Sequence, residues 1–379
     1  MHNLSYWEQQ SFFGPADVAI VGAGLVGLTA AVYLKQQRPA WRVVVLERGA
    51  LPSGGSTKNA GFACFGSVSE LLEQEQRGDL LAVVTARYEG LHRLRALLGD
   101  AVLHYRPEGN YELFRTGADE ALLAECRARL PHYNELLAAV TGRPDTFRDV
   151  SADAGRYSLG GVAGLLENQV EGSLDPGCMV RALLARAWAA DVPVLTSCAV
   201  EHLEASAAGS PVLHLAGGVR LAAGQVLLAT NAFATELCPG LAVTPGRGQV
   251  LVTEPLPGAR LPGPCHYDRG YTYFRPLPDG RVLLGGGRHL DFAAEATTAP
   301  GLTDTVQDYL ETLLREVIVP GQQTRIDYRW SGVMGFGPAL EPLLHRVQPG
   351  VLTAVRCNGM GVALGAGLGY RAATQLAAA

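Results

Sequence analysis

A strand-to-helix turn near the N-terminus constrains this chain more than any other stretch. Val18–Val21 is a short apolar run typical of a buried parallel strand, and from Gly24 onward the apolar residues recur at helical spacing. Gly22, Gly24 and Gly27 form a G-x-G-x-x-G arrangement on the turn between them. The first glycine permits the tight turn, the second lets a pyrophosphate approach the backbone, and the third lets helix and strand pack closely. The pattern predicts a Rossmann-type dinucleotide site.

A second apolar run supports this interpretation. Residues 41–47 read as a strand that ends in Glu47, where a carboxylate meets an adenosine ribose hydroxyl in such folds. The alternative is a glycine-rich turn in an ordinary α/β domain, with Glu47 a solvated strand end. The order of strand, turn, helix, strand and acid favours the dinucleotide site.

Composition limits the possible partners. The 379 residues suffice for a large core and about two domains. With 31 basic and 36 acidic side chains the net charge is −5, and Lys and Arg form no cluster. This argues against a nucleic-acid or anionic-membrane surface.

Targeting and cysteine patterns point to a cytoplasmic protein. No apolar run is long enough to span a membrane, and residues 1–15 do not resemble a signal peptide. The seven cysteines are scattered and form no C-x-x-C pair, so neither a disulfide framework nor a metal site is expected.

The segment after Glu47 is a candidate ligand loop. Residues 48–66 are too rich in Gly and Ser for regular structure, yet apolar at their end. Such a loop suits a position under a flat ligand, with Ser56 and Thr57 as phosphate or ribose partners. A plain surface loop is the alternative.

The rest of the chain returns twice to the nucleotide pattern. A buried strand ends in the A-T-N-A turn at 229–232, and a late strand at 351–355 leads through Cys357-Asn-Gly-Met-Gly into a C-terminal helix. Between them, 245–254, 271–276 and 281–287 read as antiparallel strands of another domain. We therefore expect a discontinuous nucleotide-binding domain (1–88, 150–243 and 326–379) and an inserted substrate-binding domain (89–149 and 244–325).

These motifs carry a family resemblance. The fingerprint, S-T-K-N-A-G at 56–61, L-D-P at 174–176, A-T-N-A, and W-S-G followed by N-G-M-G resemble the glycine oxidase, sarcosine oxidase and D-amino-acid dehydrogenase superfamily over essentially the whole chain. The resemblance implies FAD and oxidation of the C–N bond of a small amine or amino acid. It also implies an α/β fold: a Rossmann-type, GR2-like FAD-binding domain with an inserted α+β domain carrying a large, mostly antiparallel sheet.

The resemblance assigns cofactor contacts along the chain. The ADP half of FAD is expected at Gly22, Gly24, Gly27, Glu47 and Arg48. The flavin side is expected at Ser56, Thr57, Lys58, Asn59, Ala60 and Gly61. The adenine would meet the backbone of Val200, and the A-T-N-A turn would contribute Thr230 and Asn231. The pyrimidine end of the flavin ring would lie at Gly359, Met360 and Gly361, where a helix N-terminus stabilises negative charge.

The chain departs from these relatives where they bind the substrate carboxylate. Glycine oxidases carry an arginine shortly after W-A-G, where this chain has Met334. Sarcosine oxidases use a lysine in the final glycine motif, where Val362 and Leu364 lie here. Four arginines remain as candidates for bidentate carboxylate binding, with Arg275 preferred over the others: Arg275, Arg288, Arg329 and Arg356.

The remaining catalytic candidates lie nearby. Tyr271 and Tyr273 alternate on one strand, so both face one side and flank a small substrate. His289 follows a glycine turn and would titrate near neutral pH. Core packing of one tyrosine and a structural hydrogen bond from His289 are the alternatives.

Two further departures concern the electron acceptor and the flavin linkage. Sarcosine oxidases carry an oxygen-activating lysine where this chain has Leu283, which favours transfer to a quinone or carrier over transfer to oxygen. They attach FAD through a cysteine in the segment matching 333–338, which lacks one here. We expect non-covalent FAD.

Other functions remain as alternatives. A flavin monooxygenase or reductase fed by NAD(P)H would show a Gly-Asp turn in the late motif and a second nucleotide fingerprint, and this chain has neither. A flavoenzyme acting on a glycine-like group of tRNA would need a basic stripe. A non-catalytic flavin scaffold would have little use for a glycine-rich loop under the ring.

Overall fold

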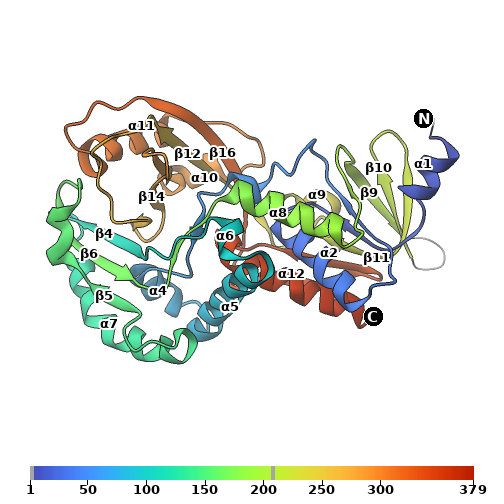
Figure 1. Cartoon of the computed structure of the whole chain (residues 1–379), viewed down its shortest axis with the longest axis horizontal. Helices are drawn as coiled ribbons and strands as arrows, with labels where there is room; N and C mark the ends of the chain where they lie inside the picture. The colour runs from blue at the N-terminus through green and yellow to red at the C-terminus, as the bar shows by residue number, and fades with distance from the viewer. Residues whose placement is uncertain (1–3, 206–209) are drawn as a thin grey trace.

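Two large β-sheets form the framework of the molecule (Figure 1). The computed structural model describes residues 4–205 and 210–379. The first sheet has the strand order β17-β18-β11-β1-β2-β8. Its central strands are parallel because helical crossovers connect them. The bounds are β1 Ala16–Val21, β2 Val43–Leu46, β8 Val194–Leu195, β11 Arg220–Leu228, β17 Leu343–Gln348 and β18 Val351–Val355.

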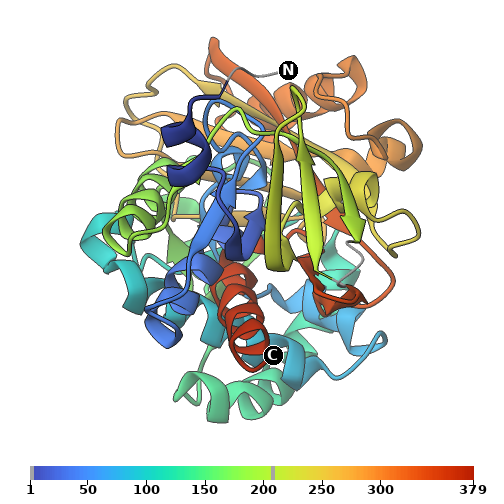
Figure 2. The same cartoon turned by 90° about the vertical axis from the view of Figure 1, so that its right-hand side faces the viewer.

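Helices bury the apolar strands of this sheet. The largest apolar cluster joins strand residues such as Ile20 and Val45 to helix residues such as Leu28 and Leu368. In Figure 2 the red C-terminal helix α12 (Gly361–Ala377) lies beside the blue helix α2 (Leu25–Gln37), so segments from both ends of the chain build one layer. The helices of this layer are α2 Leu25–Gln37, α5 Leu80–Leu98, α8 Pro176–Ala189 and α12 Gly361–Ala377.

An antiparallel extension widens the sheet. β9 (Val200–Ala205) and β10 (Pro211–Leu215) pair with each other, and β10 pairs with the first part of β11. This extension places Val200 at the edge of the nucleotide-binding end.

The second sheet is mostly antiparallel, with the order β16-β12-β15-β14-β13-β4-β6-β5. Only β13 and β4 pair in parallel. Its strands are β4 Asn110–Arg115, β5 Phe147–Asp149, β6 Val162–Asn168, β12 Thr244–Thr253, β13 Cys265–Tyr267, β14 Thr272–Pro276, β15 Val282–Gly286 and β16 Ile326–Phe336. Helices α4 Val68–Glu75, α7 Glu120–Thr141 and α11 Asp304–Leu313 pack around it.

The shorter elements connect these layers. They are α1 Tyr6–Ser11, α3 Gly55–Lys58, β3 Phe62–Ala63, α6 Asp100–Leu103, β7 Gly172–Ser173, α9 Ala234–Leu237 and α10 Phe292–Glu295, with short 3₁₀ or π turns at Ser151–Arg156, Asn231–Phe233, Arg288–Asp291 and Leu314–Ile318. Within 4–205 and 210–379, no helix is long and apolar enough to cross a membrane.

The architecture confirms the predicted α/β class with a Rossmann-type sheet and a second, mostly antiparallel sheet. The sheets cross the expected domain boundaries, however. β6 and β16 lie in segments assigned to the FAD-binding domain but pair in the second sheet, and the boundary at 88 falls inside α5. Residues 1–3 and 206–209 of the expected FAD-binding segments lie outside the described residues.

Candidate functional site

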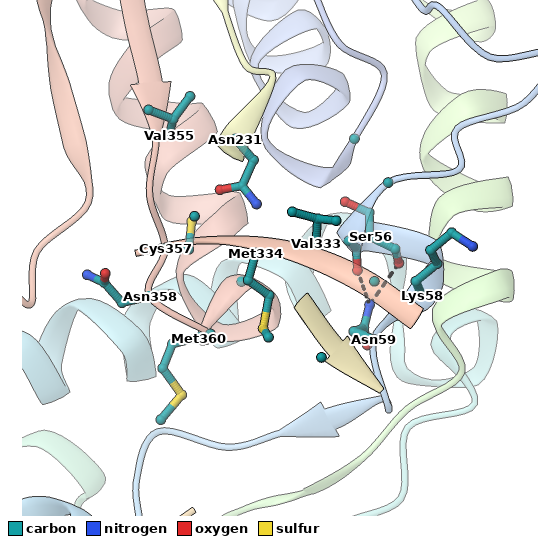
Figure 3. Close-up of a pocket in the computed structure, with 18 of the residues that line it drawn as sticks. Ser56, Lys58, Asn59, Asn231, Val333, Met334, Val355, Cys357, Asn358 and Met360 are labelled. Atoms are coloured by element: carbon teal, nitrogen blue, oxygen red, sulfur yellow. Dashed lines mark hydrogen bonds between the residues drawn. The ribbon is translucent and has the colours of Figure 1, made fainter. Parts of the chain in front are cut away.

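One cavity of about 1030 Å³ runs from the carboxyl ends of β1 and β2 to the face of the second sheet. Figure 3 shows Ser56, Lys58 and Asn59 on one side of this space, Cys357, Asn358 and Met360 on the other, and Met334 between them. The cavity joins three parts of the chain that lie far apart in sequence, as expected for an elongated dinucleotide.

The glycine turn at one end is shaped for a pyrophosphate. Gly22 has φ +105°, and a Cβ there would be 2.8 Å from the carbonyl oxygen of Ala229. A Cβ on Gly27 would be 2.0 Å from the carbonyl oxygen of Gly22, so Gly27 packs against the turn instead of lining the cavity. The amide groups of Val26 and Gly27 have no hydrogen-bond partner among the described residues. A helix N-terminus with free amides fits a phosphate.

Glu47 and Arg48 form the wall beyond this turn. The Glu47 carboxylate accepts hydrogen bonds from the amides of Ala23 (3.1 Å) and Gly49 (2.9 Å), which fixes it at the end of β2. The guanidinium of Arg48 lies 3.8 Å from the ring centre of Phe233. Both residues line the cavity, as does Val200, so the residues predicted for the adenosine half lie together.

The glycine- and serine-rich loop forms the next wall. The Ser56 hydroxyl accepts a hydrogen bond of 2.8 Å from the amide of Leu25. The Asn59 amide donates to the carbonyls of Ser56 (2.8 Å) and Gly55 (3.2 Å). Ser56, Lys58, Asn59 and Ala60 line the cavity, whereas Thr57 and Gly61 do not. Thr57 instead donates to the Pro52 carbonyl at 2.8 Å and holds the loop.

The late glycine motif closes the opposite side. Gly359 has φ +85°, and helix α12 begins at Gly361 with its N-terminus at the cavity. Asn358 braces the turn because its side chain donates to the carbonyls of Ala339 (2.9 Å) and Leu340 (3.0 Å). Asn231 and Thr230 also line the cavity, and the Thr230 hydroxyl is buried without a partner among the described residues. An orphaned hydroxyl and a glycine cradle both fit a bound FAD.

An aromatic chamber occupies the end of the cavity nearest the second sheet. Tyr271, Tyr273 and Met334 line it, and the two tyrosines face one side as predicted. Burial raises the pKa of Tyr273 to about 12, so its phenol stays neutral. The chamber is therefore mainly apolar.

Arg288 brings an unpaired positive charge into this chamber. Its guanidinium lies 3.9 Å from the ring centre of Phe336 and 5.7 Å from that of Tyr271. It makes no hydrogen bond or ion pair with any described residue. Burial lowers its pKa, but an arginine remains charged at neutral pH. Such a group suits a carboxylate supplied by a ligand.

The other candidate arginines lie elsewhere. Arg275 is buried under the loop, where it donates to the Leu174 carbonyl at 3.1 Å, and it does not line the cavity. Burial lowers its pKa to about 10. Arg329 pairs with Glu311 at 2.6 Å, and Arg356 donates to the carbonyls of Ala242 and Glu341. Arg288 replaces Arg275 as the carboxylate candidate because Gly61 and Leu174 separate Arg275 from the cavity.

His289 also lies outside the cavity wall. Its imidazole pairs with Asp268 at 3.0 Å and contacts the ring of Tyr271. Burial lowers its pKa, and Asp268 opposes that shift. The structural interpretation of His289 fits this geometry better than a catalytic one.

Among the polar residues that line the cavity and that the sequence interpretation missed are Glu70, Arg87 and His266. Arg87 and His266 lie in stretches without a recognisable motif, and Glu70 belongs to the S-x-x-E capping box that begins α4. His266 belongs to the three-residue strand β13, and only its pairing with Tyr273 of β14 reveals that it faces the same side.

Known proteins resemble the chain along most of its length. A probable oxidoreductase, OrdL, of Rhizobium meliloti (strain 1021) is 27% identical over 365 residues, covering 92% of this chain and 80% of that protein. The glycine oxidase of Geobacillus kaustophilus has a similar structure, with a TM-score of 0.77 and 19% identity over 96% of this chain and 95% of that one.

A second solved structure has the same fold. The L-proline dehydrogenase of P. horikoshii gives a TM-score of 0.75 with 16% identity, covering 96% of this chain and 93% of that one. The family model described as FAD dependent oxidoreductase matches residues 17–375, which include the glycine turn, the ligand loop and the late glycine motif. The chain therefore belongs to the DAO family of FAD-dependent oxidoreductases, and its cofactor is FAD.

Proposed function

We propose that the chain oxidises the C–N bond of a small amino acid to an imine, which water then hydrolyses. The observation that carries this proposal is the unpaired Arg288 guanidinium in an aromatic chamber beside the flavin loop. A half-buried cation without an acidic partner carries a desolvation cost, and a substrate carboxylate would offset part of it.

Each group of the chamber has a role in this reaction. Arg288 would bind the carboxylate by two parallel hydrogen bonds and fix the orientation of the α-carbon. Tyr271, Tyr273 and Met334 would surround the side chain of the substrate and exclude water. Bound FAD supplies a two-electron acceptor, which the protein alone lacks.

The relatives support the substrate class. A glycine oxidase and an L-proline dehydrogenase share the fold, and both names denote oxidation of small amino acids. This chain would use a different arginine, because Met334 occupies the place where glycine oxidases carry theirs.

Four further features stay predictions from the sequence. The FAD is held without a covalent bond, and the reaction takes place in the cytoplasm. The electrons pass to a quinone or carrier in preference to oxygen, since Leu283 stands where an oxygen-activating lysine would lie. The division into an FAD-binding domain (1–88, 150–243 and 326–379) and a substrate-binding domain (89–149 and 244–325) also stays a prediction.

The test is anaerobic mixing of the FAD-loaded protein with matched pairs of compounds. Alanine of either chirality is paired with ethylamine, sarcosine with dimethylamine, and L-proline with pyrrolidine. We expect an amino acid to bleach the flavin absorbance and its decarboxylated partner to fail. Equal bleaching by both members would contradict the role of Arg288, and bleaching by NADPH alone would contradict the proposed reaction. Oxygen admitted afterwards separates oxidase from dehydrogenase.

A further inference from the structure

His266 lies in the wall of the same cavity. It pairs across the sheet with Tyr273 on β14, and its ring stacks on Phe62 with centres 5.1 Å apart and planes inclined by 13°. Phe62 also contacts Tyr273 edge-on, with ring centres 5.4 Å apart. All three side chains line the cavity, so the imidazole is held rigidly beside the tyrosines that would surround the substrate.

The two nitrogens of this imidazole have different surroundings. Nδ1 lies 3.6 Å from a carboxylate oxygen of Glu70 and 3.4 Å from the side-chain nitrogen of Asn110. The Asn110 nitrogen makes its shorter bond, 2.7 Å, to Glu171. The negative charge of Glu70 stabilises a proton on Nδ1, the tautomer that leaves Nε2 able to accept a proton, whereas the second N–H of the Asn110 amide favours Nδ1 as an acceptor. Nε2 has no partner among the described residues, and a base held by an acid on its far side is a recurring catalytic arrangement.

Other titratable groups near the ring have hydrogen-bond partners of their own. Glu112, the β4 residue paired with His266, binds Ser67 and Ser69, and Glu171 accepts from the amides of Phe65 and Gly66. Arg87 of α5 donates to the Phe65 carbonyl and the Gln74 side chain, each at 2.9 Å. Glu70 of α4 has a partner too: one of its carboxylate oxygens accepts from the Ser67 amide at 2.9 Å in the capping box of α4, and this oxygen lies 3.6 Å from Nδ1 of His266.

Burial lowers the pKa of His266, and Glu70 opposes that shift. The ring is then neutral at neutral pH and able to accept a proton, while Glu70 stabilises the imidazolium that results.

We propose that Nε2 of His266 accepts a proton from the substrate ammonium before the C–N bond is oxidised, with Glu70 as a positioning residue. The inference rests on the proposed function. An N–H bond of the ammonium breaks and an N–H bond forms on Nε2, which frees the amine lone pair. That lone pair forms the C=N bond as the α-hydrogen leaves with two electrons, which the FAD of this family accepts. Water then takes the proton from the imidazolium.

The test compares the unsubstituted protein with His266→Gln and Glu70→Gln. Each FAD-loaded protein is mixed anaerobically with sarcosine, L-proline and alanine from about pH 6 to about pH 10, and the rate of flavin bleaching is followed. We expect His266→Gln to be slower by about 100-fold at neutral pH. Its rate should rise about tenfold per pH unit and approach that of the unsubstituted protein as the free amine becomes abundant. Glu70→Gln should move the onset of the profile, because it removes the charge that stabilises the imidazolium.

A binding measurement separates this role from packing. Methoxyacetate has the shape and carboxylate of sarcosine but no ammonium, and its binding is read from the flavin spectrum. We expect His266→Gln to bind it as the unsubstituted protein does. A rate loss that is the same at every pH, or weakened methoxyacetate binding, would overturn the role as a base. Failure of all three amino acids to bleach the unsubstituted protein would instead overturn the proposed function together with this inference.

Discussion

The two ends of the cavity are built from different parts of the polypeptide. At the cofactor end the backbone forms the site, through the turn at Gly22, the close contact at Gly27 and the free amides that begin α2. At the substrate end the side chains of Arg288, Tyr273 and His266 form the site, from separate segments of one sheet region. A site formed by the backbone requires particular glycines in a fixed order. In a site formed by side chains, the same charge can come from a different position in the sequence.

The largest expected effect is at the cofactor end. Gly27→Ala places a Cβ 2.0 Å from a backbone carbonyl oxygen that cannot turn aside. Gly24→Ala is milder for the fold, since its Cβ would be 3.1 Å from the Ser56 hydroxyl, but it occupies the space of the pyrophosphate. We expect FAD content to fall by more than about tenfold in both variants.

Absorbance of the purified protein and its thermal unfolding together check this prediction. Gly78→Ala is the control, because a Cβ there meets nothing within 4 Å. The FAD-free Gly24→Ala variant should unfold at the same temperature as the unsubstituted apoprotein. Full FAD content in this variant would contradict the proposal that the backbone at Gly24 holds the pyrophosphate.

The next largest effect is at the substrate end. Arg288→Met should weaken amino-acid binding by about 2–5 kcal/mol, because it removes the partner of a desolvated carboxylate. Adding Met334→Arg returns an arginine to the place where glycine oxidases carry one. We expect the double variant to recover part of the lost kcat/KM. Binding of the substrate carboxylate depends on where the positive charge lies and not on which strand carries the arginine.

The control for this pair is Arg329→Met, which removes an arginine paired with Glu311 away from the cavity. Its KM for the amino acid should match that of the unsubstituted protein. An unchanged KM in Arg288→Met would remove the basis for proposing an amino-acid substrate.

This contrast explains which features could be predicted from the sequence. The strand, turn and helix around Gly22 and the late motif around Gly359 are local patterns, and the structure brings both to the cavity. The sequence interpretation prefers Arg275 to Arg288, but Arg275 is covered by Gly61 and the Leu174 carbonyl. His266 carried no local signal, because its position depends on the pairing of β13 with β14.

The substrate end also carries a buried carboxyl that should make stability depend on pH. Burial raises the pKa of Glu171 from 4.5 to about 8. The unfolded chain loses this proton near its ordinary pKa, whereas the folded chain keeps it to a higher pH. Raising the pH through this interval therefore favours the unfolded state, by on the order of 5 kcal/mol.

Thermal unfolding of Glu171→Gln at about pH 5 and about pH 8 tests this effect. The variant should lose less stability across the interval than the unsubstituted protein. Its amide oxygen can still accept from Phe65 and Gly66, and the Asn110 side-chain oxygen is free to accept from the new amide. An identical pH dependence in both proteins would show that Glu171 does not titrate there.

The smallest effect is expected for the cysteines of the cavity wall, Cys64, Cys198 and Cys357. A covalent link to flavin through cysteine needs a reactive thiolate, but burial raises the pKa of all three, that of Cys357 to about 12. Cys357→Ala should therefore leave FAD content unchanged. Acid precipitation of either protein should leave the yellow colour in solution, as expected if non-covalent contacts alone retain the cofactor. Colour that stays with the pellet of the unsubstituted protein but not of Cys357→Ala would instead identify a covalent bond to this thiol.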